Sequence, residues 1–357
     1  MADWHEPFEA AYRFMRVSRL TGYETEQLDG IISGTLQLNQ DTETFETADL
    51  VAARRLDLGA DLVRGYLDAT FGDGTVETVC LGTWLCNVPS RRIDGVLEDS
   101  TAVLDGTLQE LAEDSFDAPV TVAAGENAVS YAVGIAQGAG LACSATPSDS
   151  ALTTDWTFGL QASGEEDGGS KLEAVNALLA LAGYGSASTD RMGNVVMAPY
   201  VDPAQRTPVW TFEEGVNATF LAEADEERDT SAVANVVLAI YEDSESTVIG
   251  EAVDDDPMSP YSTVSIGRRK VVKKTYHGTA TQAEADAKAA ELLKTNQSVI
   301  HRVKLQHVHC PATVGDVVRL KWPSAGIDAT FAIRTQTVKL GSAGCMTVSE
   351  LRRFVRR

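Results

Sequence analysis

The chain has 357 residues, 44% of them hydrophobic, and a formal net charge of −23, a composition typical of globular proteins with more than one domain. Its start lacks a basic n-region followed by an apolar h-region, and no apolar run approaches the about 20 residues that cross a bilayer, so neither a signal peptide nor a membrane span is predicted. Residues 1–260 hold 12 Lys and Arg against 46 Asp and Glu, which argues against a nucleic-acid-binding role for this region.

Residues 1–125 read as a β-rich domain. "GTLQLNQ" alternates apolar and polar residues, and "FGDGTVETV" places Asp73-Gly74 between two apolar runs, which is a hairpin signal. Trp84 is expected in the core of the strand that follows. Pro89 is expected to end that strand, and another short strand follows within "RRIDGVLEDSTAVLDGTL".

Two cysteines flank this tryptophan. On a strand, Cys80, Gly82, Trp84 and Cys86 share one face, and the two cysteines lie about 20 Å apart, too far for a disulfide. The chain has no CxxC pair, and its other cysteines are Cys143, Cys310 and Cys345. We therefore expect buried, reduced thiols here, with a metal or redox role as the alternative.

Residues 126–205 change to small residues and helical patterns. "ENAVSYAVGIAQGAGLA" predicts one helix, and "KLEAVNALLALAG" predicts a second that ends at Gly183. An acidic, Gly-rich loop from Gly159 to Lys171 precedes the second helix, and "GNVVMAPYVDP" predicts a short strand. The segment reads as a small α/β insert, and prolines at 199, 203 and 208 mark its end.

Residues 206–357 return to a β pattern with one helix at about 281–296, whose start is a capping box of Thr281 and Glu284. The predicted strands are "TPVWTFEEGV", "AVANVVLAIYED", a basic strand "VSIGRRKVVKKTY", two strands around a turn at Pro311–Asp316, and a final antiparallel pair, "TFAIRTQTVKL" and "GCMTVSELRRF". The loop "VDDDPMSPYSTV" is acidic. The last segment, "LRRFVRR", fits a terminal strand or a docking segment better than a nucleic-acid tail, and we expect it to contact an acidic neighbour such as another copy of the chain.

No catalytic motif stands out. The chain has no GxSxG elbow, no phosphate-binding GxxxxGK[ST], no HExxH and no calcium loop. With 52 acidic residues, carboxylate pairs suited to glycosidase chemistry occur everywhere and carry no signal. We assign no catalytic, cofactor-binding or metal-binding residue and expect no cofactor.

One cluster raises a metal question: His301, His307, His309 and Cys310. On a strand His307 and His309 point to one side about 6.6 Å apart, which is compatible with a shared metal. The other two interpretations are histidines packed or hydrogen-bonded at a strand end, which we expect, and a pH-sensitive contact.

Several stretches resemble the tail-hub proteins of bacteriophages and prophages: "ISGTLQLNQDTETFETADL", "YLDATFGDGTVETVCLGTW", "LCNVPSRRIDG", "VLDGTLQELAEDSF" and "HCPATVGDVVRL". That group includes the baseplate hub of contractile phages and the late control protein D. The resemblance implies a β-rich α+β fold with two β-barrel domains, residues 1–125 and 206–357, and a small α/β insert, residues 126–205.

The resemblance also implies a function. Three copies would form a ring that joins the tail tube, or distal tail protein, to the tip or spike and lets DNA pass. The protein would be a non-enzymatic component of the virion tail, made in the cytoplasm of the bacterial host. The alternatives are a distal tail ring protein, a carbohydrate-binding tail module and a tail-associated cell-wall hydrolase. An acidic channel that repels DNA would account for part of the negative charge.

Overall fold

The computed structural model describes residues 3–94, 97–158, 169–229, 233–242, 247–277, 281–296, 299–341 and 347–355. The chain divides into two compact units. Unit 1 comprises residues 1–223 and 305–350, and unit 2 comprises residues 224–304 and 351–357. The predicted acidic loop at 159–171 lies mostly outside the described residues, and so does Cys345.

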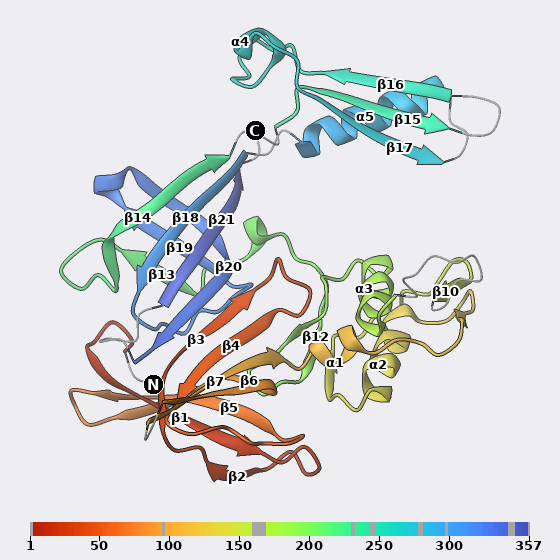
Figure 1. Cartoon of the computed structure of the whole chain (residues 1–357). Helices are drawn as coiled ribbons and strands as arrows, with labels where there is room; N and C mark the ends of the chain where they lie inside the picture. The colour runs from red at the N-terminus through yellow and green to blue at the C-terminus, as the bar shows by residue number, and fades with distance from the viewer. Residues whose placement is uncertain are drawn as a thin grey trace. The chain divides into compact units, whose positions relative to one another are not determined.

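The first part of unit 1 is an antiparallel run of strands (Figure 1). Local signals account for its turns, since Asp73 accepts a hydrogen bond from the Thr75 amide and Gly74 adopts a left-handed φ of 84° in the predicted hairpin. The strands are β1 (Phe8–Val17), β2 (Glu24–Gln27), β3 (Ile31–Asn39), β4 (Glu46–Ala52), β5 (Leu62–Phe71), β6 (Val76–Asp94) and β7 (Leu97–Gly106).

The middle of unit 1 is a small mixed layer of helices and short strands with its own apolar core. Gly183 follows its second long helix in the left-handed conformation, as the sequence predicts. Its elements are α1 (Gln109–Glu113), β8 (Val120–Val122), α2 (Ala128–Gly138), β9 (Cys143–Ala145), β10 (Trp156–Phe158), α3 (Lys171–Leu181), β11 (Ser188–Thr189), β12 (Val195–Met197) and η1 (Pro203–Gln205).

Strands from the last third of the chain extend the sheet of the first part. The 13-stranded sheet has the order β14-β18-β21-β20-β3-β4-β7-β6-β5-β1-β2, with β13 and β19 paired beside β20. β20 pairs antiparallel with β3, so the two expected barrels share one sheet, whose order does not close on itself along the described residues. These elements are β13 (Trp210–Glu213), β14 (Phe220–Asp229), β18 (Val299–His307), β19 (Val317–Trp322), η2 (Pro323–Ala325), β20 (Ile327–Leu340) and β21 (Thr347–Val355).

Unit 2 contains a three-stranded sheet of order β16-β15-β17, with α5 against one face. Both halves of the predicted capping box are present, since Glu284 accepts from the Thr281 amide at 2.7 Å and Thr281 Oγ1 accepts from the Glu284 amide at 3.3 Å. The elements are β15 (Val236–Glu242), β16 (Thr247–Val253), α4 (Thr263–Ile266), β17 (Val271–His277) and α5 (Gln282–Asn296).

Two local expectations were wrong. Pro89 does not end its strand, because β6 continues to Asp94 with Pro89 opposite Ala102 of β7. The described pairing of β6 with β5 stops at Leu85, so a proline there interrupts no ladder on that side. The segment "VSIG" is not strand: Ser262 caps α4 by accepting from the Ser265 amide, Gly267 follows with a left-handed φ, and the basic strand begins only at Val271.

The strand through Trp84 also contains an irregularity. Gly65 lies opposite Gly82 while Tyr66 lies opposite Cys80, which leaves Leu81 as an extra residue in a bulge. The bulge separates Cys80 from the expected shared face. Trp84 is 1% exposed in the core of the first part, as predicted.

Candidate functional site

A buried polar junction in unit 1 forms around the turn that links β11 to β12. Asp190 shapes this turn, because its Oδ1 accepts from the amides of Met192 and Asn194, each at 2.9 Å. Gly193 adopts a φ of 83°, and a Cβ added there would lie 3.0 Å from Thr107 Cγ2. Glycine therefore lets the turn approach the first part of the chain closely.

The backbone carbonyls of this turn accept hydrogen bonds from side chains of β5, β6 and the segment after β7. Buried polar groups need hydrogen-bond partners, so these bonds hold the insert against the first part. Arg191 O accepts from Cys80 Sγ at 3.2 Å and Thr83 Oγ1 at 3.0 Å, Met192 O accepts from Arg64 Nη2 at 3.3 Å, and Gly193 O accepts from Thr107 Oγ1 at 2.8 Å.

The Arg191 side chain joins three parts of the sequence. Its Nη1 donates to Leu81 O in β6 at 2.8 Å, and its Nη2 donates to Thr313 Oγ1 in the segment between β18 and β19. Burial lowers the pKa of Arg191, and the nearby Glu46 carboxyl partly offsets that effect. The Arg191 guanidinium therefore links the insert to the first part of the chain and to the segment that precedes the C-terminal strand β19.

Glu46 supplies the acidic partner at the start of β4. The residue is 2% exposed and accepts a hydrogen bond from Thr189 Oγ1. Burial raises the pKa of Glu46 to about 7, although Thr189 and Arg191 favour the charged form. The carboxyl is thus poised to change its charge near neutral pH.

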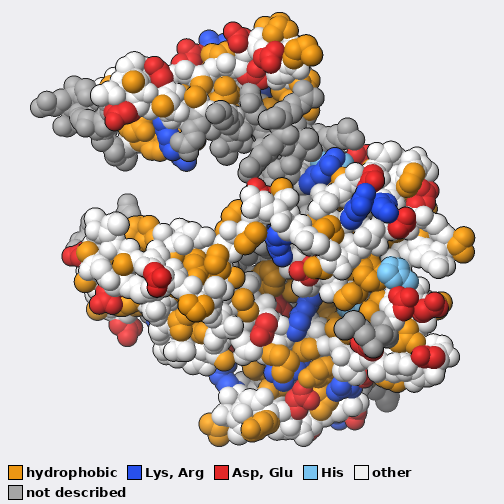
Figure 2. Space-filling model, turned by 180° about the vertical axis from the view of Figure 1, so that it is seen from behind, with side chains coloured by type: hydrophobic (Ala, Val, Ile, Leu, Met, Phe, Trp, Pro, Cys, Tyr) orange, Lys and Arg blue, Asp and Glu red, His pale blue; other side chains and the backbone are white. Residues whose placement is uncertain are grey.

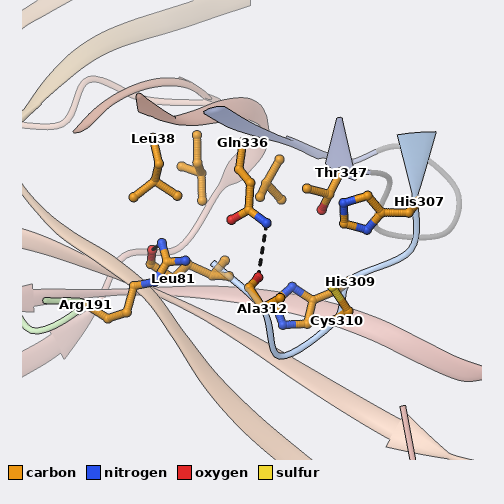
Figure 3. A pocket seen from close by; sticks show the side chains of 11 residues that line it. Leu38, Leu81, Arg191, His307, His309, Cys310, Ala312, Gln336 and Thr347 are labelled. Atoms are coloured by element: carbon orange, nitrogen blue, oxygen red, sulfur yellow. Dashed lines mark hydrogen bonds between the residues drawn. The ribbon is translucent and has the colours of Figure 1, made fainter. Parts of the chain in front are cut away.

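A small cavity of about 10 Å³ lies beside Arg191 (Figure 3). Leu38 and Gln336 lie on one side, and Arg191, Leu81 and Ala312 lie on the other. Gln336 Nε2 donates to Ala312 O across the cavity at 3.1 Å. This volume holds about one water molecule, so the junction is a packed structural contact and too small for a substrate. The lining residues are Leu36, Leu38, Leu81, Arg191, His307, His309, Cys310, Ala312, Gln336, Val338 and Thr347.

His307 and His309 lie at this cavity, and the structure gives them structural neighbours. His307 Nδ1 donates to Val308 O at 2.6 Å and its Nε2 accepts from Ser349 Oγ at 2.8 Å, so both ring nitrogens are engaged. The His309 ring packs edge-on against Trp4, with centroids 5.1 Å apart. Burial lowers the pKa of His307 to about 4 and that of His309 to about 3, which keeps both rings neutral near pH 7.

His301 belongs to a different environment in unit 2. Arg353 Nε donates to His301 Nδ1 at 3.0 Å, which directs the ring N–H at Nε2 toward Glu226 Oε1, 2.7 Å away. Among the residues that the structure describes, no group of three or more His, Cys, Asp or Glu could hold a metal ion. The four described cysteines are free thiols, and burial raises the pKa of Cys310 to about 12.

A wider hollow of about 370 Å³ lies beside β13, lined by His5, Thr211, Glu213, Glu214, Gly215, Val216, Asn217 and Thr219. Its carboxylates already have partners in the protein. Glu213 accepts from Lys321 Nζ at 3.3 Å, and Glu214 accepts from the amide and hydroxyl of Ser324. This geometry does not resemble a general acid and base facing a common substrate.

Sequence reasoning did not identify Arg191 or Glu46. Arg191 is the only basic residue between Lys171 and Arg206, and the turn signal around Asp190 and Gly193 was readable. Neither feature indicates that the Arg191 guanidinium is buried. Its hydrogen-bond partners lie in β6 and in the segment before β19, which are distant in the sequence.

Negative charge gathers on unit 1. Unit 1 carries 15 Lys and Arg against 38 Asp and Glu, while unit 2 carries 14 of each, so the whole net charge of −23 belongs to unit 1. On the face of unit 1 visible in Figure 2, acidic side chains occur in separate groups among hydrophobic ones. None of the described helices is long and apolar enough to cross a membrane.

Solved structures share this fold, although no family model and no curated protein matches the sequence. A tail protein from Neisseria meningitidis MC58 aligns over 96% of both chains with a TM-score of 0.65 and 15% identity. The 43 kDa tail protein of prophage MuSo2 from Shewanella oneidensis aligns over 97% of this chain and 98% of its own, with a TM-score of 0.64 and 11% identity. The chain has the fold of phage tail proteins.

The same fold occurs in a protein complex from Francisella. A chain of the Francisella PdpA–VgrG complex aligns over 97% of this chain and 58% of its own, with a TM-score of 0.60 and 8% identity. These likenesses confirm the β-rich α+β fold class and the resemblance to phage tail proteins predicted from the sequence.

Proposed function

We propose that this chain is a structural, non-enzymatic subunit of a phage or prophage tail tip, in which three copies form a hub ring. The observation that carries the proposal is the likeness to the Neisseria tail protein along 96% of both chains. The fold that this chain shares with that tail protein extends along nearly its whole length, which supports a structural role. Residues 1–125 and 206–357 would supply the ring-forming β domains and residues 126–205 the insert.

The charge distribution supports a ring through which DNA passes. With a net charge of −23 on unit 1, a channel lined by part of this unit would repel the phosphates of DNA. DNA would then slide through without specific binding. An assembled ring with an electropositive channel would contradict this part of the proposal.

The buried junction supports a structural role as well. Its hydrogen bonds join the insert to strands from both ends of the chain, and its charged groups are occupied by those bonds. Such a network suits a subunit that transmits force between a tube and a tip. The expected partners are other copies of the chain, the tail tube or distal tail protein, and the tip or spike protein.

The solution mass of the purified chain tests the ring, by light scattering after size exclusion at low and at moderate salt. A trimer of about 114 kDa, three times 38.1 kDa, is the expected result, weakening as salt screens surface charges. A hexamer of about 229 kDa, six times 38.1 kDa, would instead indicate a distal tail ring. A chain that clears cell walls would support the hydrolase, and binding to cell-wall sugars would support the carbohydrate-binding module.

A further inference from the structure

In the part of unit 2 that the structure describes, α5 packs against one face of the three-stranded sheet, and the edge strands of the opposite face remain largely exposed. Alternate residues of β15, β16 and β17 point to the same side, and the pairing register sorts them into two faces. Gly250 lies on the face against α5, because a Cβ added there would lie 2.1 Å from the Ala285 backbone. The opposite face, called the open face here, consists of Val236, Leu238, Ile240, Ile249, Glu251, Val253, Val271, Lys273 and Thr275.

The open face is apolar across three strands. One row holds Val253, Val236 and Val271 side by side, with Val236 fully buried at its centre, and a second holds Ile249 and the half-buried Ile240 beside Thr275. The outer side chains remain accessible, since Ile249 is 48% exposed and Val253 and Val271 are each 43% exposed. A sheet that is apolar on both faces is stable when both are covered.

The dimensions of the open face suit the centre of an interface. Three strands about 4.8 Å apart and three rows about 6.6 Å apart cover roughly 280 Å². That area approaches the largest apolar patch of an ordinary monomer, about 300–600 Å². It is smaller than the about 800 Å² that each partner buries in a stable complex, so charged residues around it must take part.

The charged residues at the open face favour an acidic partner. Lys273 lies on the face in β17, and Arg269 Nη2 donates to Glu251 Oε1 at 2.6 Å on the opposite edge. Arg268 is exposed, and its backbone carbonyl accepts from Asn235 at the start of β15. Lys273 on the face and Arg269 beside it therefore accompany one carboxylate, Glu251, that is already paired with Arg269.

A second copy of this chain would offer such an acidic partner, because unit 1 bears the whole net charge of −23. Unit 1 also exposes apolar side chains beside acids. Leu20 is 94% exposed and Tyr23 is 76% exposed, and the exposed strand β2 that follows carries Glu24 and Glu26. A contact between different surfaces of identical chains closes into a ring when its rotation permits.

We propose that the open face of unit 2 docks on the acidic unit 1 of a second copy of this chain. The inference rests on the proposed ring and names the surface that would join its subunits. Apolar contact supplies affinity at the centre, and the basic residues select the acidic partner and speed its association.

Substitutions on the open face test the surface separately from the ring. Wild-type mass reports whether the ring forms, whereas Ile249→Glu and Val271→Glu report whether this face joins it. We expect each variant to weaken self-association at least tenfold, and Lys273→Glu to weaken it while Lys273→Arg does not. Met258→Glu is the matched control, because Met258 is 84% exposed in unit 2 outside the three strands.

A ring unchanged by Ile249→Glu and Val271→Glu would overturn this inference and leave the proposed function intact. Circular dichroism and thermal unfolding of each variant show whether it remains folded. If a variant unfolds, or if the wild-type chain associates too weakly to measure, a photo-crosslinking amino acid is placed at position 249 instead. Mixing isotopically labelled and unlabelled chains then distinguishes cross-links between copies from cross-links within one chain. Cross-links from position 249 to unit 1 of another copy support the proposal, and cross-links only within one chain or only to unit 2 overturn it.

Discussion

At the scale of single residues, the junction depends on two buried groups of opposite charge. Arg191 and the charged form of Glu46 attract each other in a buried site, so each reduces the cost of burying the other. Removing one partner would leave the other charge uncompensated. Protonation of Glu46 therefore affects how strongly this pair holds the insert in place.

The pKa of Glu46 makes a pH prediction. The carboxyl ionises near pH 4.5 when unfolded and near pH 7 when folded, so the folded chain holds its proton more tightly and loses stability as the pH rises through this window. At about 1.4 kcal/mol per pKa unit, the loss from this group is about 3 kcal/mol. Glu46→Gln keeps an acceptor for Thr189 and should abolish this loss.

Urea unfolding at about pH 5 and about pH 8 measures the effect, because comparing the variant with the wild type cancels other titrating groups. Glu9→Gln is the control, since Glu9 is an exposed residue of β1. If Glu46→Gln changed stability equally at both pH values, Glu46 would not be held protonated by burial.

The sequence predicted part of the residue-scale picture. It anticipated histidines that are packed or hydrogen-bonded, and in the structure His307 is hydrogen-bonded while the His309 ring packs against Trp4. It did not anticipate that His301 pairs with Glu226 and Arg353. Those partners come from other strands, and residue spacing within one strand carries no information about them.

At the scale of elements, the contact between α5 and β16 depends on a glycine. A Cβ at position 250 would meet the carbonyl carbon and oxygen of Ala285, and backbone atoms of a helix cannot rotate away as a side chain can. Gly250→Ala should therefore destabilise unit 2 by about 3 kcal/mol. Hydrogen exchange of the β15 and β16 amides measures the loss directly.

Gly134→Ala provides the control for this prediction. A Cβ at Gly134 in α2 would have no heavy atom within 4 Å, so removing a helical glycine should stabilise the insert by about 0.5–1 kcal/mol. Wild-type protection of β15 and β16 in Gly250→Ala would show that α5 does not pack as described.

Local elements were the most predictable. The helices α2, α3 and α5 follow from apolar spacing and end signals that lie within about 15 residues of sequence. The prediction that Pro89 ends its strand was wrong. A proline disrupts a strand only where its missing N–H would pair with a neighbouring strand, and the sequence does not reveal that pairing. The pairing of β3 with β20 joins residues about 300 positions apart, and no local pattern encodes that register.

At the scale of the whole molecule, short motifs predicted a likeness to phage tail proteins, and solved tail proteins share the fold at 15% identity or less. At such identity the fold is retained through the pattern of apolar positions, which tolerates extensive substitution. The acidic excess of residues 1–260 was readable from the sequence, but its restriction to unit 1 was not, because unit 2 combines residues 224–304 with the last seven residues of the chain.

The central claim is that copies of this chain form a threefold ring at the end of a tail tube. Electron microscopy of the purified chain mixed with a tail tube protein and a distal tail protein tests this claim most directly. We predict class averages with a threefold ring at one end of the tube and an open central channel. Tube ends that stay bare, or a ring with true sixfold symmetry built from this chain, would contradict the account.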